Sequence, residues 1–238
     1  RIGDSELLVL GLGRLGGGAL THASDLDLVY LFDSGSGGST ESDGPRPLTT
    51  SLYFNRLATR VTAALSVPTA EGALYEVDTR LRPQGNQGPL AVSLESFEQY
   101  QRADAWTWEH MALCRARPLY GSANARARLA AIIRQVLETP RDAEKLMADV
   151  LSMRGEMAKH KPPRGPLDVK LQRGGLVDCE FLVHYLQQRE HQGLAPGVEV
   201  AIAGLIEAGL LPADFGAHFS TLARLLIAAR LLAPDSAE

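Results

Sequence analysis

In this chain of 238 residues, a glycine-rich segment near the start is followed by two closely spaced aspartates, and this combination is compatible with few folds. Gly16 and Gly17 end the segment 11–17, and Asp25 and Asp27 follow after an interval of seven residues, 18–24. Apolar runs at 6–10 and 26–32 predict a strand on each side of the glycines. Residues i and i+2 of a strand point to the same face, so both carboxylates can share a cation, which prefers oxygen ligands.

The glycines have two competing interpretations. Gly11, Gly13 and Gly16 fit the pattern Gly-x-Gly-x-x-Gly of dinucleotide-binding proteins, and Asp33 lies near the distance of a ribose-binding acid. However, 17–24 leaves room for only about two helical turns, whereas a parallel crossover needs a dozen or more residues. The layout instead resembles the nucleotidyltransferase fold of the polymerase-beta type, in which a phosphate loop precedes a strand carrying Asp-x-Asp. A structural alternative is that the aspartates serve only as turn residues at a strand entry.

A third acidic residue is expected on a second strand. From Leu74 to Pro83 charged and uncharged residues alternate, as the two-residue period of a strand requires. The charged face carries Asp78, the best candidate for completing a two-metal site, with Glu76 as the reserve, and it also carries Arg80 and Arg82. Two metal ions could polarise an attacking oxygen and hold phosphates for in-line displacement, and the arginines could neutralise a departing pyrophosphate. A charged face that merely meets solvent is the alternative.

Composition excludes several classes. The net charge of −4 provides no overall basic field for nucleic acid or an anionic membrane. No apolar run reaches the length of a membrane span, and we expect a soluble, cytoplasmic protein. Cys114 and Cys179 form no Cys-x-x-Cys pair and are expected to be buried thiols.

The strand signals stop after Gly121. Helical periodicity indicates an amphipathic helix over 52–65, a helix from Ser93 as N-cap toward Gln101, and another over 106–117. Beyond Gly121 the sequence predicts helices only, over 123–138, 142–160, 176–192, 198–210 and 215–232. We therefore expect an α+β domain, a short mixed sheet with helices at 1–120, followed by an all-α helical bundle at 121–238.

Four segments together resemble one family. They are 11–17 with 24–28, Tyr75-Glu-Val-Asp-Thr-Arg-Leu-Arg-Pro83, 105–117, and Gly174-Gly-Leu-Val-Asp-Cys-Glu-Phe181. In this order they resemble the bacterial bifunctional glutamine synthetase adenylyltransferases, large enzymes with two nucleotidyltransferase halves. One half attaches AMP from ATP to a tyrosine of glutamine synthetase, and the other removes it by phosphorolysis. The segments 74–78 and 106–110 are most similar to the adenylylating, carboxy-terminal half.

The resemblance implies roles for individual residues. Asp25, Asp27 and Asp78 would bind Mg²⁺, with Asp78 helping to ionise the tyrosine hydroxyl, and ATP would be the substrate. Nucleotide phosphates would be bound by Gly16, Gly17, Ser24, Arg80 and Arg82. The implied partners are glutamine synthetase and a nitrogen-signalling protein of the PII type.

Other motif residues have a structural alternative beside the functional one. The spacing of Trp106, Trp108 and His110 favours packing of two helix faces into a core. Arg115 and Arg117 could reach phosphate or pair with acids such as Glu109. Asp178 and Glu180 could stabilise the start of a helix, whereas the resemblance implies positions around the active site. Glu180 and His184 also have the spacing of a surface pair, without the pattern of a zinc site.

Three further functions remain open at this point. Phosphorolytic removal of AMP from glutamine synthetase is the nearest alternative. A dinucleotide-dependent oxidoreductase would bind NAD(P)H without Mg²⁺. A non-catalytic regulatory module would bind Mg-ATP or the PII protein without turnover.

Overall fold

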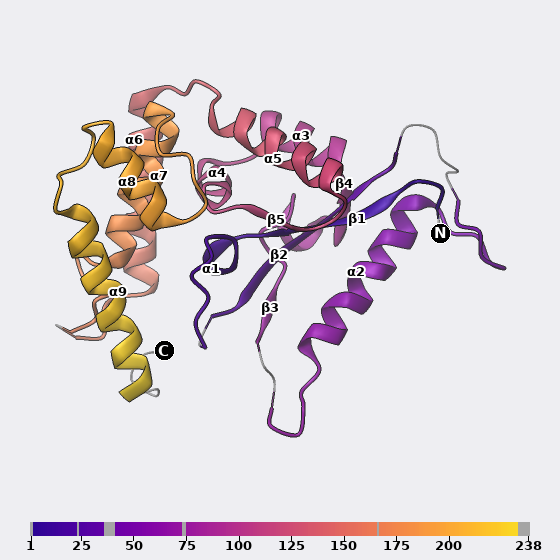
Figure 1. Ribbon diagram of the computed structural model, residues 1–238, viewed down its shortest axis with the longest axis horizontal. Coiled ribbons are helices and arrows are strands. Elements are labelled where there is room, and N and C mark those ends of the chain that lie inside the picture. Colours follow the sequence, from indigo (N-terminus) through magenta and orange to yellow (C-terminus); the bar gives the residue numbers. More distant parts are fainter. Residues whose placement is uncertain (1, 23, 36–40, 73–74, 166, 233–238) are drawn as a thin grey trace. The chain divides into compact units, whose positions relative to one another are not determined.

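The chain divides into two compact units, Arg1–Val136 and Leu137–Glu238. We describe them from a computed structural model, which covers residues 2–22, 24–35, 41–72, 75–165 and 167–232 (Figure 1). The first unit holds a small mixed sheet with helices, so the expected α+β class is confirmed.

The sheet is built around β2 (Leu26–Asp33). β1 (Glu6–Gly11) pairs with it antiparallel, and β5 (Arg117–Tyr120) pairs antiparallel with the far edge of β1. On the other edge of β2, the short strands β3 (Val77–Asp78) and β4 (Ala91–Ser93) follow one another, both parallel to it. The antiparallel β1–β2 pair is incompatible with the dinucleotide-binding interpretation, because that motif requires two parallel strands.

Helix α2 (Thr50–Ser66) covers one face of this sheet. Its buried Phe54 and Ala58 pack on alternate residues of β2, including Tyr30 and Phe32, and the rings of Phe32 and Phe54 stack with centroids 4.9 Å apart. The expected helix over 52–65 is therefore present. The even-numbered residues of β2 belong to this apolar face, which leaves Asp27 and Asp33 for the other.

Helices α3 (Leu94–Ala103) and α5 (Ala123–Leu137) lie on the opposite side of the sheet from α2, as Figure 1 shows. Ser93 caps α3 as expected, accepting the amide of Ser96 at 3.1 Å. Ser122 joins α5 to the sheet by donating to Glu6, and Arg128 pairs with Asp33. These contacts explain why the compact unit extends beyond Gly121, nearly to the end of α5.

The expected strand over 74–83 is wrong in length. Only Val77 and Asp78 pair with β2, while Leu74 lies outside the described residues. The strand stops because the carboxylate of Asp78 accepts the amide of Arg80 at 2.8 Å, which turns the chain. A 3-10 turn, η1 (Gly85–Gln87), follows before β4, a strand that the sequence analysis missed.

The expected helix over 106–117 is too long. Helix α4 (Thr107–Leu113) ends in a tighter turn, in which the backbone amides of Arg115 and Ala116 donate to the carbonyls of the residues three positions earlier. Arg117 precedes Pro118, and a residue before proline favours an extended backbone. Pro118 is tolerated in β5 because this is an edge strand.

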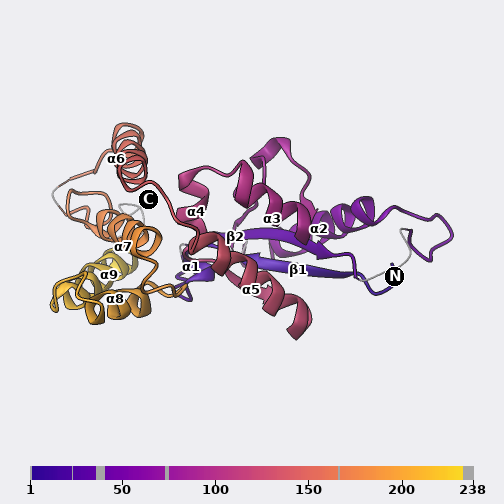
Figure 2. The same cartoon turned by 90° about the horizontal axis from the view of Figure 1, so that it is seen from above.

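The second unit contains α6 (Ala143–His160), α7 (Leu176–Glu190), α8 (Val198–Glu207) and α9 (Phe215–Leu232). Figure 2 shows α7, α8 and α9 lying side by side. In the described parts of this unit, helices are the only regular elements.

Contrary to the sequence analysis, α9 is long and apolar enough to cross a membrane by length and composition alone, and only 17% of that window is buried. This is weak evidence of a span, and α9 also carries Arg224 and Arg230.

Candidate active site

Two aspartates face each other across the β2–β3 pair. Asp27 is in register with Asp78, and Leu26 donates its amide to the carbonyl of Glu76 at 2.8 Å. Asp25 lies just before the first residue of β2 and is exposed. The pairing thus brings together acids that are about fifty residues apart in sequence, as the two charged strand patterns predicted.

The carboxylate of Asp27 lies against the start of α1 (Gly13–Gly16). A Cβ built on Gly13 would lie 2.2 Å from Oδ2 of Asp27, and the φ angle of +53° at Gly13 is one that side-chain-bearing residues rarely adopt. The amide of Leu12 also donates to the Asp27 carbonyl at 2.9 Å. Gly13 therefore provides the space in which the carboxylate lies.

Burial and like charges act together on Asp27. Its pKa rises from 3.8 to about 6, first because burial disfavours the charged form and then because Asp78 and Asp25 are nearby. Arg115 and Arg80 oppose the rise. For Asp78 the pKa is lowered, mainly because the Arg80 side chain donates to its carboxylate.

The donor set suits a hard divalent cation. The three neighbouring carboxylates offer the oxygen ligands of Mg²⁺. Burial first, and then Asp78 and Asp25, disfavour the negative charge of Asp27 and raise its pKa, and a bound cation would offset that charge. However, no three acidic, histidine or cysteine side chains within the described residues are arranged to enclose a metal. Asp78 is instead engaged by Arg80, with Nε 2.9 Å from Oδ2, so it would have to leave Arg80 to join such a site.

The glycine segment makes a tight turn beside these acids. The amides of Gly16 and Gly17 donate to the carbonyls of Leu12 and Gly13, so phosphate binding through them would require these bonds to open. Gly16 is required for packing, because a Cβ there would lie 2.0 Å from the carbonyl oxygen of Arg115. The Ser24 hydroxyl is buried and accepts the amide of Thr21 at 3.0 Å.

The two arginines after Asp78 do not share a strand face, contrary to the sequence analysis. The Arg80 side chain pairs with Asp78, and 72% of it is exposed to solvent. Arg82 folds back and donates to the carbonyl of Thr79 at 2.7 Å, which stabilises the turn that ends β3. Glu76 is exposed and contributes its carbonyl to the sheet.

Arg115 and Arg117 lie in different surroundings and make different contacts. Arg115 is buried and lies close enough to Asp27 to lower its pKa. Arg117 donates from Nε to Gly16 and from Nη2 to Leu15, both at 2.9 Å, and so holds the carbonyl end of α1. Contacts of Arg117 with the glycine turn were not predicted from sequence.

The expected core packing of the two tryptophans is wrong. Trp106 is 70% exposed because it precedes the first turn of α4, and Trp108, inside the helix, is 42% exposed. His110 is buried as expected, with Nε2 2.8 Å from the carbonyl of Gln101. Glu109 is also buried, where it accepts the Trp106 amide at 2.9 Å and the Tyr100 hydroxyl at 3.0 Å.

Asp178 and Glu180 belong to the second unit. Asp178 pairs with Arg154 of α6 and accepts the amide of Gly174 at 2.6 Å, which fixes the glycine pair before α7. Glu180 is half-buried on the same helix. The buried His184 has Nδ1 3.0 Å from Oε1 of Gln187.

Sequence reasoning missed the part played by Gly13. The signal was present, since a glycine shortly after a strand and before Asp-x-Asp is where a close backbone approach is expected. The interpretation instead assigned importance to Gly16 and Gly17, whose pairing was the more conspicuous feature.

Comparisons with known proteins identify the family of this chain. The glutamate-ammonia ligase adenylyltransferase family model matches residues 2–132. The bifunctional glutamine synthetase adenylyltransferase/adenylyl-removing enzyme of Brucella suis is 50% identical over 185 residues, 78% of this chain and 19% of the relative. The protein of the same name from Bordetella bronchiseptica is 43% identical over 244 residues, 98% of this chain and 25% of the relative.

The chain thus spans about a fifth to a quarter of these relatives. The family match covers more than half of the chain and includes the glycine turn and all three aspartates. The chain belongs to the glutamate-ammonia ligase adenylyltransferase family.

Proposed function

We propose that this chain transfers AMP from ATP to a tyrosine of glutamine synthetase and releases pyrophosphate. The observation that carries the proposal is the pairing of β2 with β3, which places Asp27 beside Asp78. Asp25 is near enough for its charge to raise the pKa of Asp27, and the chain belongs to an adenylyltransferase family. The first unit would be a nucleotidyltransferase domain of the polymerase-beta type, and the second an all-α domain. We place the protein in the cytoplasm, with glutamine synthetase and a PII-type protein as partners.

Asp25 and Asp27 would hold Mg²⁺, with Asp78 joining them in a two-metal site. When bound, Mg²⁺ would neutralise phosphate charge and lower the pKa of the tyrosine hydroxyl, which is about 10 in model compounds. The oxygen donors and the raised pKa of Asp27 support this assignment.

The reaction joins the tyrosine oxygen to the α-phosphorus of ATP and breaks the bond from that phosphorus to the bridging oxygen of pyrophosphate. Asp78 would orient the hydroxyl that loses its proton. Arg80, whose guanidinium is exposed, could move from Asp78 to the departing pyrophosphate, because phosphate is an alternative partner for its paired donors.

Several residues would act by position. Gly13 leaves room for the Asp27 carboxylate, and Arg117 holds the glycine turn by its carbonyls. Arg82 stabilises the turn after Asp78. The proposed phosphate neighbours are still Ser24, Gly16 and Gly17. Five further residues are proposed to support the site without contacting the reacting atoms: Glu76, Glu109, Arg115, Asp178 and Glu180.

Removal of AMP by phosphorolysis is the second candidate function. It is favoured by the name of the relatives, which describes both an adenylyltransferase and an adenylyl-removing enzyme. The same acidic cluster could serve it, with phosphate attacking the α-phosphorus of adenylyl-tyrosine.

Mass spectrometry of glutamine synthetase incubated with this chain, Mg²⁺ and ATP tests the proposal. We expect an AMP adduct on a tyrosine that needs Mg²⁺ and disappears with the Asp25→Asn, Asp27→Asn double variant. Glu71→Gln, which removes one acidic charge from an exposed loop, is the matched control and should retain the adduct.

Two results would redirect the assignment. Absence of the adduct, together with release of ADP from pre-adenylylated glutamine synthetase in phosphate, would assign the chain to AMP removal. Tight Mg-ATP binding without either reaction would instead indicate a regulatory module.

A further inference from the structure

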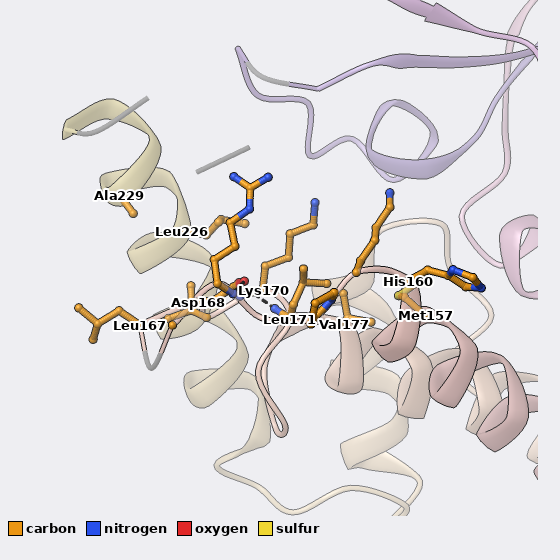
Figure 3. Close-up of a pocket in the computed structure, with 14 residues that line it drawn as sticks. Met157, His160, Leu167, Asp168, Lys170, Leu171, Val177, Leu226 and Ala229 are labelled. Carbon is orange, nitrogen blue, oxygen red and sulfur yellow. Dashed lines mark hydrogen bonds between the residues drawn. The ribbon is translucent and has the colours of Figure 1, made fainter. Parts of the chain in front are cut away.

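The second unit contains a cavity of about 690 Å³ whose lining combines basic and apolar side chains (Figure 3). It is formed by the end of α6, the segment that leads to α7, and parts of α7 and α9. Its volume is in the range of small-molecule sites. The residues of this cavity have no part in the proposed AMP transfer.

The basic side chains come from one short stretch. They are His160, Lys161, Arg164 and Lys170. Within the described residues, neither Lys161 nor Arg164 has a carboxylate partner for its side chain, and both are exposed. By contrast, the neighbouring Lys159 outside the cavity pairs with Glu156 at 2.6 Å.

The acidic residue of the lining, Asp168, is bound to backbone amides. Its Oδ1 accepts the amides of Lys170 at 3.1 Å and Leu171 at 3.0 Å, and its Oδ2 accepts the amide of Arg164 at 3.2 Å. Asp168 therefore shapes the loop that presents the basic side chains. Its carboxylate is positioned by these bonds, and the described lining of the cavity also carries three lysine and arginine side chains.

The loop is also anchored to the start of α7. The amides of Leu176 and Val177 donate to the carbonyls of Val169 at 2.9 Å and Lys170 at 3.1 Å. Arg154, which holds Asp178, donates to the carbonyl of Leu171 at 3.0 Å. The backbone from Val169 to Leu171 is thus held in place, which lowers the entropic cost of binding a ligand at Lys170.

Apolar side chains form another part of the wall. Figure 3 shows them coming from different elements: Met157 of α6, Val177 of α7, Leu226 and Ala229 of α9, and Leu171. A purely inorganic anion would contact only the basic part of the wall, whereas a phosphorylated molecule with a ring would contact both parts.

We infer that this cavity binds the phosphate groups of a small phosphorylated ligand, with Lys161 and Arg164 as its principal contacts. Because the chain carries a net charge of −4, attraction of such an anion must arise locally, from a concentration of basic groups like this one. An arginine beside lysines suits phosphate, because its guanidinium donates two parallel hydrogen bonds. Two sources share this chemistry, a nucleotide and a free polyphosphate.

Calorimetric titration of the whole chain in EDTA, with ADP and with pyrophosphate as separate probes, tests the inference. EDTA removes the divalent cations on which the acidic cluster would depend, so the two sites are distinguished. We expect binding that weakens about tenfold or more in the Lys161→Gln, Arg164→Gln double variant, because two charged contacts are lost. Both side chains are exposed, and circular dichroism would verify that the variant folds.

Two further proteins act as controls. Lys159→Gln removes a neighbouring positive charge outside the cavity, and Asp25→Asn, Asp27→Asn alters the acidic cluster; both should keep the wild-type affinity. Tighter binding of ADP than of pyrophosphate, reduced by Leu226→Ala, would identify a nucleotide as the source, and equal affinities a free polyphosphate. The inference is overturned if neither probe binds, or if the Lys161→Gln, Arg164→Gln variant binds as the wild type does.

Discussion

Asp27 is the residue on which burial and neighbouring charge act together. Its pKa of about 6 in the folded chain exceeds the ordinary value of 3.8, so between these two pH values the folded state holds a proton that the unfolded state has released. Stability without metal therefore falls as the pH rises from about 4 to above 6. This is the reverse of the usual behaviour of a carboxylate that gains a cationic partner on folding.

Replacement of Asp27 by Asn removes this titration. In EDTA, we expect the stability of Asp27→Asn relative to wild type to increase by roughly 1–2 kcal/mol between about pH 4 and pH 7.5, less than the unscreened shift because the group is partly hydrated. Urea unfolding at several pH values would measure it, with Glu71→Gln as the control for a lost negative charge. A pH-independent difference would contradict the account of Asp27.

Gly13 gives a second residue-scale prediction. Gly13→Ala should destabilise the first unit by about 1–3 kcal/mol and displace the Asp27 carboxylate, because strain at positive φ is combined with a close contact. Gly18→Ala is the matched control, since Gly18 also has a positive φ but open space beside it. Thermal unfolding would compare the two, and equal losses would show that the contact with Asp27 is unimportant.

At the scale of elements, the sequence predicted regular structure well where burial enforces a period. The apolar runs of β1 and β2 and the long helices α2 and α6 were found in place. Prediction failed where side chains bond to the nearby backbone. The alternating charges after Asp78 are typical of a strand, but Asp78 and Arg82 both form hydrogen bonds to the backbone of a turn, which ends the strand. Similarly, helical spacing could not reveal that Trp106 precedes α4 and stays exposed.

The same distinction applies to the candidate site. Its acids could be predicted because strand alternation fixes the direction of their side chains and pairing fixes their neighbours. The contacts of Arg117 with α1 could not, since they link residues about a hundred positions apart that belong to no common pattern.

The connection between α6 and α7 provides the element-scale prediction. Arg154→Met should lower the free energy of unfolding by about 2–3 kcal/mol, because Asp178 would lose its charged partner while remaining largely out of water. Arg173→Met, at an exposed position nearby, serves as the control and should change stability little. A loss no larger for Arg154→Met than for Arg173→Met would contradict a structural role for the Arg154–Asp178 pair.

At the scale of the whole molecule, the proposed chemistry and the proposed phosphate cavity lie in different units. In the first unit, the pairing of β2 with β3 positions Asp27. In the second unit, the carboxylates of Asp168 and Asp178 accept backbone amides and so hold the loop before α7. We therefore expect cation binding to depend on the aspartates of the first unit, and cation-independent phosphate binding to depend on the basic residues of the second unit.

The most direct test of the central claim is Mn²⁺ binding to the whole chain, measured by electron paramagnetic resonance with a non-hydrolysable ATP analogue. Mn²⁺ replaces Mg²⁺ at oxygen-rich sites and reports on its own environment. We predict that about two ions bind in the wild type, as a two-metal site requires, and that Asp25→Asn, Asp27→Asn loses them while Glu71→Gln keeps them. Equal Mn²⁺ binding by all three proteins would contradict the assignment of these aspartates as the metal-binding centre.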